Sequence, residues 1–261
     1  MEQKTLLHSL QYENKLRKLQ KQLKHSSYRC EVNESDYCAF EPHKQQLLQQ
    51  SLISNRFVAI FDVNKWEYML FQGQLRLTKE YTPHPTPAMA SVAFRKSLLS
   101  THTLFMLDSL ALATKFMTDM TEEQKKEYLL VFDYRYCDAL GINLRFTQRT
   151  EVLRTDCNGN IWLVKMEIEL MPGNVTDSPP QRWLKHRKSN TYPLFTDNKL
   201  PTPTEIEVLR RIMMGQYSKK ISKELFICKC TVDKHRQNII GKTYTTDTLQ
   251  AIHLMRQIEL I

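Results

Sequence analysis

The 261-residue sequence predicts a multidomain protein in which an α+β domain, built on an antiparallel sheet, precedes an all-α domain of four helices. Runs of β-branched and aromatic residues, separated by turn signals, fill residues 56–71 and 129–171, with helical patterns between them. From residue 200 onward, apolar residues instead recur at helical spacing between capping signals. The expected segments are an N-terminal helix over 1–30, the α+β domain over 31–172, a polar linker over 173–199 and the all-α domain over 200–261.

The N-terminal helix is predicted by an apolar stripe within residues 2–25. Leu16, Leu19 and Leu23 recur at spacings of three and four, while Lys, Gln and Glu occupy the other faces. Such a stripe suits a short coiled coil with a second chain, or packing on the chain's own domain. Fewer than four clean heptads are present, so both interpretations stay open and the helix is a candidate for dimerisation.

The α+β domain is expected to run from two strands through several helices to a three-stranded meander. Asn158-Gly159 predicts a tight hairpin turn in the meander, because both residues tolerate positive φ. Thr121 with Gln124 predicts a capping box. The strands are expected at 56–63, 66–71, 129–137, 142–155 and 161–171, and the helices at 42–54, 89–100, 102–118 and 121–128.

Charge is distributed unevenly along the chain. Residues 1–25 carry six Lys/Arg against two Asp/Glu, and residues 200–261 carry ten against six, so each has a net charge of +4. Residues 26–172 carry sixteen against eighteen, net −2. A basic terminal module beside a nearly neutral body suits a polyanion such as nucleic acid, although excess lysine also simply keeps proteins soluble.

Several protein classes find no support in the sequence. The start lacks a signal-peptide core, and the longest apolar stretch, 104–117, is interrupted by Asp108 and Lys115. We therefore expect a cytoplasmic protein without a membrane segment, with free thiols on its six cysteines. Cys228-Lys-Cys230 lacks a second Cys/His pair at zinc spacing, so no metal is expected.

An enzyme is not expected, because no nucleophile–base pair or phosphate-cradling glycine loop is present. The acidic residues on predicted strands and turns are scattered: Asp133, Asp138, Glu151 and Asp156. His84 and His102 could ligate haem, but lone histidines are more often structural. No cofactor is therefore predicted.

The all-α domain begins with strong local signals. Thr202, Pro203 and Glu205 predict a capping box with proline at the first helical position, and Gly215 predicts a left-handed stop. Asp247 can cap the fourth helix. The second and third helices are expected at 218–225 and 229–240, joined by a tight turn at 226–228.

The third helix carries the candidate DNA-reading residues. Asp233, Lys234 and Gln237 point away from the inward Val232 and Ile239, which places them for base edges in a major groove. His235 could instead be a core histidine, and the lysines an ordinary solvated face. The helix-turn-helix motif spans 218–237. The candidates for phosphate contacts flank the three base-reading residues: Lys219, Lys220, Thr231, His235, Arg236, Asn238 and Lys242.

This pattern resembles the LuxR/GerE-type helix-turn-helix. The resemblance implies a four-helix DNA-binding domain that acts as a dimer and regulates transcription. Cys228 stands where the family has the serine that caps the recognition helix, which should weaken the cap by about 1 kcal/mol. The matching positions are Thr202, Glu205, Val208, Leu209, Gly215, Lys219, Ile221, Leu225, Thr231, Val232, His235, Asn238, Ile239 and Lys242. The other departures are Pro201, Ser222, Thr243 and Thr248.

Residues 40–172 resemble a PAS domain in their order of strands, helices and closing meander. That resemblance implies a small cavity between sheet and helices, and often dimerisation. The predicted function is sequence-specific binding of double-stranded DNA and transcription regulation by a homodimer. The N-terminal domain would sense an unidentified small-molecule ligand or mediate dimerisation. The alternative is an interaction adaptor whose N-terminal domain binds a partner protein and senses no small molecule.

Overall fold

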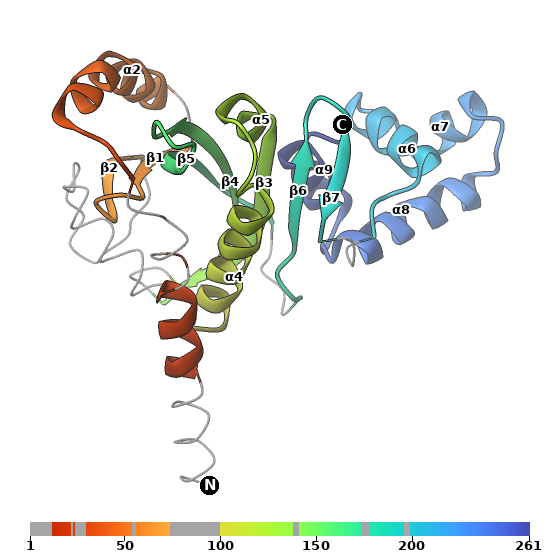
Figure 1. Ribbon diagram of the computed structural model, residues 1–261. Helices are drawn as coiled ribbons and strands as arrows, with labels where there is room; N and C mark the ends of the chain where they lie inside the picture. The colour runs from red at the N-terminus through yellow and green to blue at the C-terminus, as the bar shows by residue number, and fades with distance from the viewer. Residues whose placement is uncertain are drawn as a thin grey trace, which may run out of the picture.

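The computed structural model describes residues 12–21, 23, 30–53, 56–73, 100–137, 141–173, 178–195 and 199–261. Within these residues, an antiparallel sheet of seven strands in the order β2-β1-β5-β4-β3-β6-β7 forms the centre of the molecule (Figure 1). The strands are β1 Phe57–Asp62, β2 Glu67–Gln72, β3 Tyr128–Cys137, β4 Asn143–Thr155, β5 Ile161–Leu170, β6 Arg182–His186 and β7 Thr191–Leu194.

The first five strands have the arrangement expected of a PAS-like domain. β1 pairs with β2 and β5, and the meander β3-β4-β5 follows the helical segment. The turn between β4 and β5 has Gly159 at φ +80°, and the Asp156 carboxylate accepts hydrogen bonds from the backbone of Asn158 and Asn160, at 3.0 and 2.7 Å. The predicted α+β class and its hairpin turn are confirmed.

Helices cover both faces of the sheet. α4 (Ser100–Phe116) lies on the inner face, where it packs in the core with Phe57, Phe132 and Phe146. α5 (Glu122–Lys126) follows it and has the capping box that Thr121 and Gln124 predict. On the opposite, outer face, α2 (Glu34–Ile53) packs over β1, β2 and β5. This arrangement leaves the outer face of β3, β4 and β6 for the C-terminal domain (Figure 1).

A cavity of about 240 Å³ lies between the inner face of the sheet and α4. Its wall includes Gln20 and Leu23 from the N-terminal segment, whose residues 12–21 are helical. Leu19 and Leu23 pack in one cluster with Leu107 and Ala111 of α4. The described part of the leucine stripe is therefore covered by the chain's own domain.

α2 begins earlier than the sequence suggests. The pattern predicts a start near Pro42, but the helix begins at Glu34 and Pro42 lies inside it. The Asn33 side chain accepts hydrogen bonds from the backbone N–H of Ser35, at 2.8 Å, and of Asp36, at 3.3 Å. This N-cap, with Glu34 and Asp36 in the first turn, explains the earlier start.

Residues 182–194, which the sequence places in a linker, form β6 and β7. β6 pairs with β3 in a register that sets Trp183 opposite Val131, and it buries Trp183 and Leu184. β7 is an edge strand and accommodates Pro193, whose missing N–H is tolerated there. Two such short strands in a polar, proline-containing stretch have too little periodicity to be recognised from sequence.

Residues 89–99 of the helix predicted at 89–100, and His84, lie outside the described residues. The other histidine considered for haem, His102, is buried, and its Nδ1 accepts a hydrogen bond of 2.8 Å from the backbone N–H of Arg135. Burial lowers the pKa of His102 to about 4, which keeps this acceptor neutral. His102 thus has a structural partner on β3.

The C-terminal region is all-α. Its core contains Val208, Ile221 and Val232, which have no exposed surface. The four helices are α6 Pro203–Met213, α7 Ser218–Glu224, α8 Lys229–Thr243 and α9 Thr248–Gln257. Among the described residues, none of the helices combines the length and apolar character needed to cross a bilayer.

Candidate nucleic-acid interface

The predicted caps position the helices of the C-terminal domain. The Thr202 hydroxyl accepts from the backbone of Glu205 at 3.4 Å, and the Glu205 carboxylate accepts from the backbone of Thr202 at 2.7 Å. Gly215 has φ +76° after the end of α6. The Asp247 carboxylate accepts from the Gln250 backbone at 2.9 Å and caps α9. These three local predictions are confirmed.

A tight turn between α7 and α8 produces the helix-turn-helix. The chain turns through Phe226, which has φ 55°, and the Ile227 N–H donates to the Ser222 carbonyl at 3.0 Å. Ile221 of α7 and Val232 of α8 are both fully buried and lie in one apolar cluster. Two short helices are thereby fixed against each other with the outer side of α8 in solvent.

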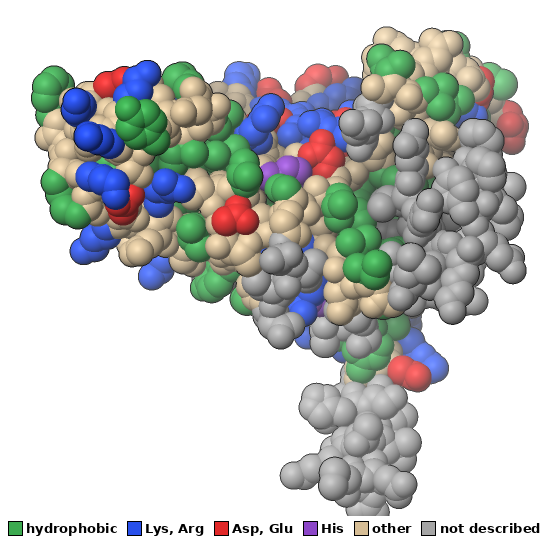
Figure 2. Space-filling view, turned by 180° about the vertical axis from the view of Figure 1, so that it is seen from behind, with side chains coloured by type: hydrophobic (Ala, Val, Ile, Leu, Met, Phe, Trp, Pro, Cys, Tyr) green, Lys and Arg blue, Asp and Glu red, His purple; other side chains and the backbone are tan. Residues whose placement is uncertain are grey.

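The exposed face of α8 is continuous over three turns. Cys230, Lys234, Gln237 and Gly241 are exposed and recur at spacings of four, three and four, which places them on one side of a helix. Figure 2 shows Lys and Arg side chains gathered on the C-terminal domain, at the left of that view. The exposed lysines of α7 and α8 are Lys219, Lys220, Lys223, Lys229 and Lys234.

The three residues predicted for base readout differ in their surroundings. Lys234 and Gln237 are exposed, and Asp233 is partly exposed. The Asp233 carboxylate contacts Lys229 Nζ at 3.0 Å, and hydrogen bonds from Ser218 and Lys229 lower its pKa. Asp233 is therefore an ionised acceptor that joins the starts of α7 and α8, and Lys234 and Gln237 project past it.

The residues predicted for phosphate contacts divide into two groups. Lys219, Lys220 and Asn238 are exposed on the outer sides of α7 and α8. Lys242 instead forms an ion pair of 2.6 Å with Glu205, whose side chain is 3% exposed. Since Glu205 belongs to the capping box of α6, Lys242 links the end of the recognition helix to the start of the domain.

The remaining three of these residues are partly buried. The Thr231 hydroxyl lies 3.0 Å from Sγ of Cys228. Arg236 donates to the Ser218 hydroxyl at 3.3 Å across the α7–α8 contact. His235 is half-buried, and its Nδ1 has no hydrogen-bond partner within the described part of the chain.

Cysteine occupies the start of α8 in a way that the sequence does not predict. Cys228 and Cys230 form a disulfide, so the expectation of six free thiols is wrong for this pair. Cys228 is nevertheless the N-cap residue, and its sulfur accepts from the Thr231 N–H at 3.2 Å. No group of three or more His, Cys, Asp or Glu side chains is placed to hold a metal ion in the described residues.

The far end of α8 is held by two residues of the N-terminal domain that sequence reasoning missed. Gln181 donates to the Thr243 carbonyl at 2.8 Å, and Arg145 donates to the Tyr244 carbonyl at 3.2 Å. Both carbonyls lie at the C-terminal end of α8, where the helix dipole favours a positive charge such as that of Arg145. Nothing in the sequence marks these residues, because their partners are remote along the chain.

α9 is packed against the outer face of the sheet. Ile252, Met255 and Ile258 are buried in one apolar cluster with Val131 and Trp183. Together with Leu249, which is 69% exposed, these residues recur at spacings of three and form an apolar stripe on this helix. In this arrangement the chain's own sheet covers the stripe.

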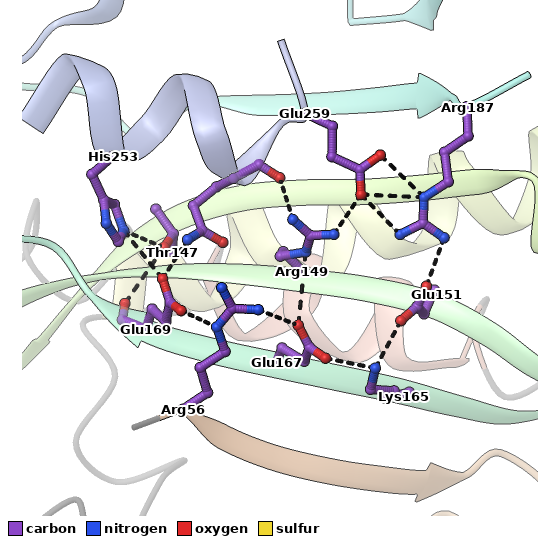
Figure 3. A network of polar contacts seen from close by, with 11 residues as sticks. Arg56, Thr147, Arg149, Glu151, Lys165, Glu167, Glu169, Arg187, His253 and Glu259 are labelled. Carbon is purple, nitrogen blue, oxygen red and sulfur yellow. Dashed lines mark hydrogen bonds and ion pairs between the residues drawn. The ribbon is translucent and has the colours of Figure 1, made fainter. Parts of the chain in front are cut away.

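A network of charged residues surrounds this contact (Figure 3). The Glu259 carboxylate accepts from Arg149 at 2.6 Å and from Arg187 at 3.1 Å. Arg187 also contacts Glu151, at 2.8 Å, and Lys165 joins Glu151 to Glu167. The Thr147 hydroxyl lies 3.2 Å from Nε2 of His253 on α9. The two domains are thus joined by ion pairs around an apolar contact.

Replacing Glu259 with glutamine should weaken docking of α9 by about 1 kcal/mol, a value discounted because the side chain is one-third exposed. Burial raises the pKa of Glu259, but bonds from Arg187 and Arg149 outweigh it, so the net pKa is lowered from 4.5. A carboxylate whose pKa is lower in the folded than in the unfolded state contributes stability at pH values above its unfolded pKa. That contribution is lost as pH falls through its folded pKa. Urea denaturation at several pH values between 3 and 7 should show that the free energy of unfolding falls less steeply with decreasing pH in the variant.

Glu207→Gln is the control for this prediction, because it breaks only the i,i+4 pair with Arg211 on α6. It should leave the decrease in the free energy of unfolding at acid pH unchanged. If the free energy of unfolding falls as steeply with decreasing pH in Glu259→Gln as in the unaltered protein, the role of Glu259 is contradicted.

The structure joins an α+β PAS-like domain to a basic helix-turn-helix domain. Residues 201–255 match the family model described as bacterial regulatory proteins, luxR family. The C-terminal domain is therefore a LuxR-type helix-turn-helix domain, and its family is one of regulators rather than of enzymes.

The chain also has a loose likeness to solved structures. A phage VqmA–DPO complex is 16% identical over 84% of this chain and 90% of that chain, with a TM-score of 0.33. A Vibrio cholerae VqmA–ligand–DNA complex is 15% identical over 82% and 87%, with a TM-score of 0.31. An RNA-binding light-oxygen-voltage receptor is 10% identical over 76% and 47%, with a TM-score of 0.32. No curated protein matches the chain.

Proposed function

We propose that the protein is a transcription regulator that binds double-stranded DNA through α8 and senses a small molecule in its PAS-like domain. The observation that carries the proposal is the exposed face of α8, which presents Lys234 and Gln237 to solvent within a LuxR-type domain. An α-helix with its side chains is about as wide as the major groove of B-DNA. Lys suits guanine acceptors and Gln suits adenine.

Each recognition helix is short, so a useful affinity calls for two of them. We propose a homodimer in which the two copies of α8 meet half-sites about one helical turn apart. Lys219 and Lys220 of α7 and Asn238 of α8 are exposed beside the reading face and would contact the phosphates. The cavity in the N-terminal domain supports ligand sensing, because a domain that only binds a partner protein has no need of one.

Selection of bound DNA from a random pool with the full-length protein tests this function directly. A recovered motif with two related halves is the expected result. Failure to retain any double-stranded oligonucleotide, even at low salt where phosphate contacts are strongest, would contradict the proposal.

Replacing Gln237 with alanine should alter the preference at one base pair of each half-site by about 1–3 kcal/mol, since one bidentate contact is lost. Affinity for a random duplex should change little. Binding of a set of single-base variants of the selected site measures the effect. An unchanged preference at every position would remove Gln237 from base readout.

Replacing Lys219 with alanine should instead weaken binding to all duplexes alike and make the dependence of log K on log[salt] shallower by about one unit per protomer. Lys115, which is exposed on α4 of the other domain, provides a control substitution to alanine that should leave the slope unchanged. An unaltered slope in Lys219→Ala would count against a phosphate contact.

A further inference from the structure

The cavity inside the N-terminal domain has a mostly apolar lining. Side chains of α4 form one wall and side chains of β4 and β5 the other. Apolar members include Met106, Leu110, Ala113, Val152, Val164 and Met166. Such a wall favours an apolar occupant, because water inside it finds few hydrogen-bond partners.

One polar group in this wall is unsatisfied. Gln148 of β4 is 1% exposed, and its Nε2 donates to the Thr150 hydroxyl at 3.1 Å. Its Oε1 is buried and has no hydrogen-bond partner among the residues that the structure describes. Buried acceptors are nearly always paired, so an unpaired one in a cavity wall indicates a place for a donor from outside the chain.

The lining offers no uncompensated charge among the described residues. Glu151 is the charged residue of this wall, but its two carboxylate oxygens contact Lys165 at 3.0 Å and Arg187 at 2.8 Å. A charged ligand would therefore lose its hydration without gaining a counter-ion, and that loss is prohibitive in an apolar cavity.

The volume limits the size of the occupant. The cavity measures about 240 Å³. An apolar cavity of about 150 Å³ holds benzene, and pockets for drug-sized ligands measure about 300–1,000 Å³. One ring with substituents, or two small fused rings, fits between these limits.

We propose that this cavity binds a small, uncharged and largely apolar molecule whose N–H or O–H group donates a hydrogen bond to Oε1 of Gln148. The assignment rests on the proposed sensing function of the PAS-like domain and adds the chemical class of its ligand. It places recognition on β4, at a side chain that sequence reasoning did not single out.

The test compares three probes by calorimetry with the full-length protein. Indole carries an N–H donor, indene replaces that N–H with CH₂ at nearly the same size, and benzoate carries a charge. Indole should bind at least about ten-fold more tightly than indene, and benzoate should not bind, because only indole satisfies Gln148 without burying a charge. Binding of neither neutral probe, equal binding of both, or tighter binding of benzoate would overturn the proposal.

A matched pair of variants locates the effect. Gln148→Met removes the amide at similar length and should abolish the difference between indole and indene. Thr114→Val changes another lining hydroxyl, on α4, and should preserve the difference. A preference for indole that survives in Gln148→Met would exclude Gln148 as the acceptor. Folding of each variant is checked by circular dichroism, and the comparison of probes on the unaltered protein needs no variant.

The probes are titrated without DNA, and DNA retention is measured separately. Retained DNA binding without any probe binding would overturn the ligand class and leave the regulator intact. Probe binding without DNA retention would overturn the regulator and leave the ligand site intact.

Discussion

Replacing Arg145 with methionine should lower the free energy of unfolding by about 3–5 kcal/mol, because it leaves a buried carboxylate without its partner. Arg145 is 4% exposed and Asp133 is fully buried, and Nε of the arginine donates to the carboxylate at 2.6 Å. The same guanidinium donates to the Tyr244 carbonyl at the end of α8. The substitution should therefore also loosen the recognition helix. Urea denaturation of the full-length protein measures the loss.

Two further variants isolate the cause. Arg154→Met removes an arginine from the same strand whose side chain is 41% exposed, and it should cost less than about 0.5 kcal/mol. Adding Asp133→Asn to Arg145→Met removes the unpaired charge. In the unaltered protein the backbone N–H of Gln181 donates to the Asp133 carboxylate at 2.5 Å, and the amide oxygen of an asparagine can accept the same hydrogen bond. The double variant should recover at least half of the loss. A loss below about 1 kcal/mol, or no recovery, would contradict a buried ion pair.

The loss should also depend on pH. Burial already raises the pKa of Asp133 from 3.8, although Arg145 opposes the shift. Without Arg145, the carboxyl folds in its protonated form, and the cost of that protonation grows as pH rises above the unfolded value. The difference between Arg145→Met and the unaltered protein should therefore shrink as pH falls toward 4.

Replacing Trp183 with alanine should cost about 3–5 kcal/mol and release α9 from the sheet. Trp183 is 3% exposed and lies in the apolar cluster that contains Val131, Ile252 and Met255. The substitution opens a void between the two domains. Hydrogen exchange of the α9 amides under native conditions should accelerate, because docking contributes to their protection.

Trp162→Ala is the matched control, since Trp162 is 4% exposed in the separate cluster beneath α2. It should cost a similar amount of stability and leave exchange in α9 unchanged at native conditions. Equal acceleration in both variants, or none with Trp183→Ala, would show that the cluster does not hold the domains together.

The parts of this fold that sequence predicts well are those set by neighbours in the chain. The capping box at Thr202 and Glu205, the stop at Gly215 and the turn at Gly159 each depend on residues within five positions. The buried positions Val232 and Ile239 follow from helical spacing alone. The fold class and the helix-turn-helix could therefore be predicted almost completely.

The contacts between the domains could not. Arg149 and Glu259 are 110 residues apart, and Gln181 and Thr243 are 62 apart. Nothing in the local pattern around a surface-type residue such as Arg145 reveals that it is buried. The strands β6 and β7 were missed because their pairing with β3, rather than their own periodicity, makes them strands.

β4 is the single layer of backbone that lies between the cavity of the N-terminal domain and helix α9 of the C-terminal domain. Its successive side chains alternate: Gln148 and Thr150 enter the cavity, whereas Thr147 and Arg149 contact the His253 ring and the Gln257 carbonyl of α9. A shift of this strand by a fraction of an ångström on one side is therefore imposed on the other without any intervening hinge. The proposed ligand site and the docking surface for α9 share a single structural element, so a substitution in β4 that alters one should alter the other.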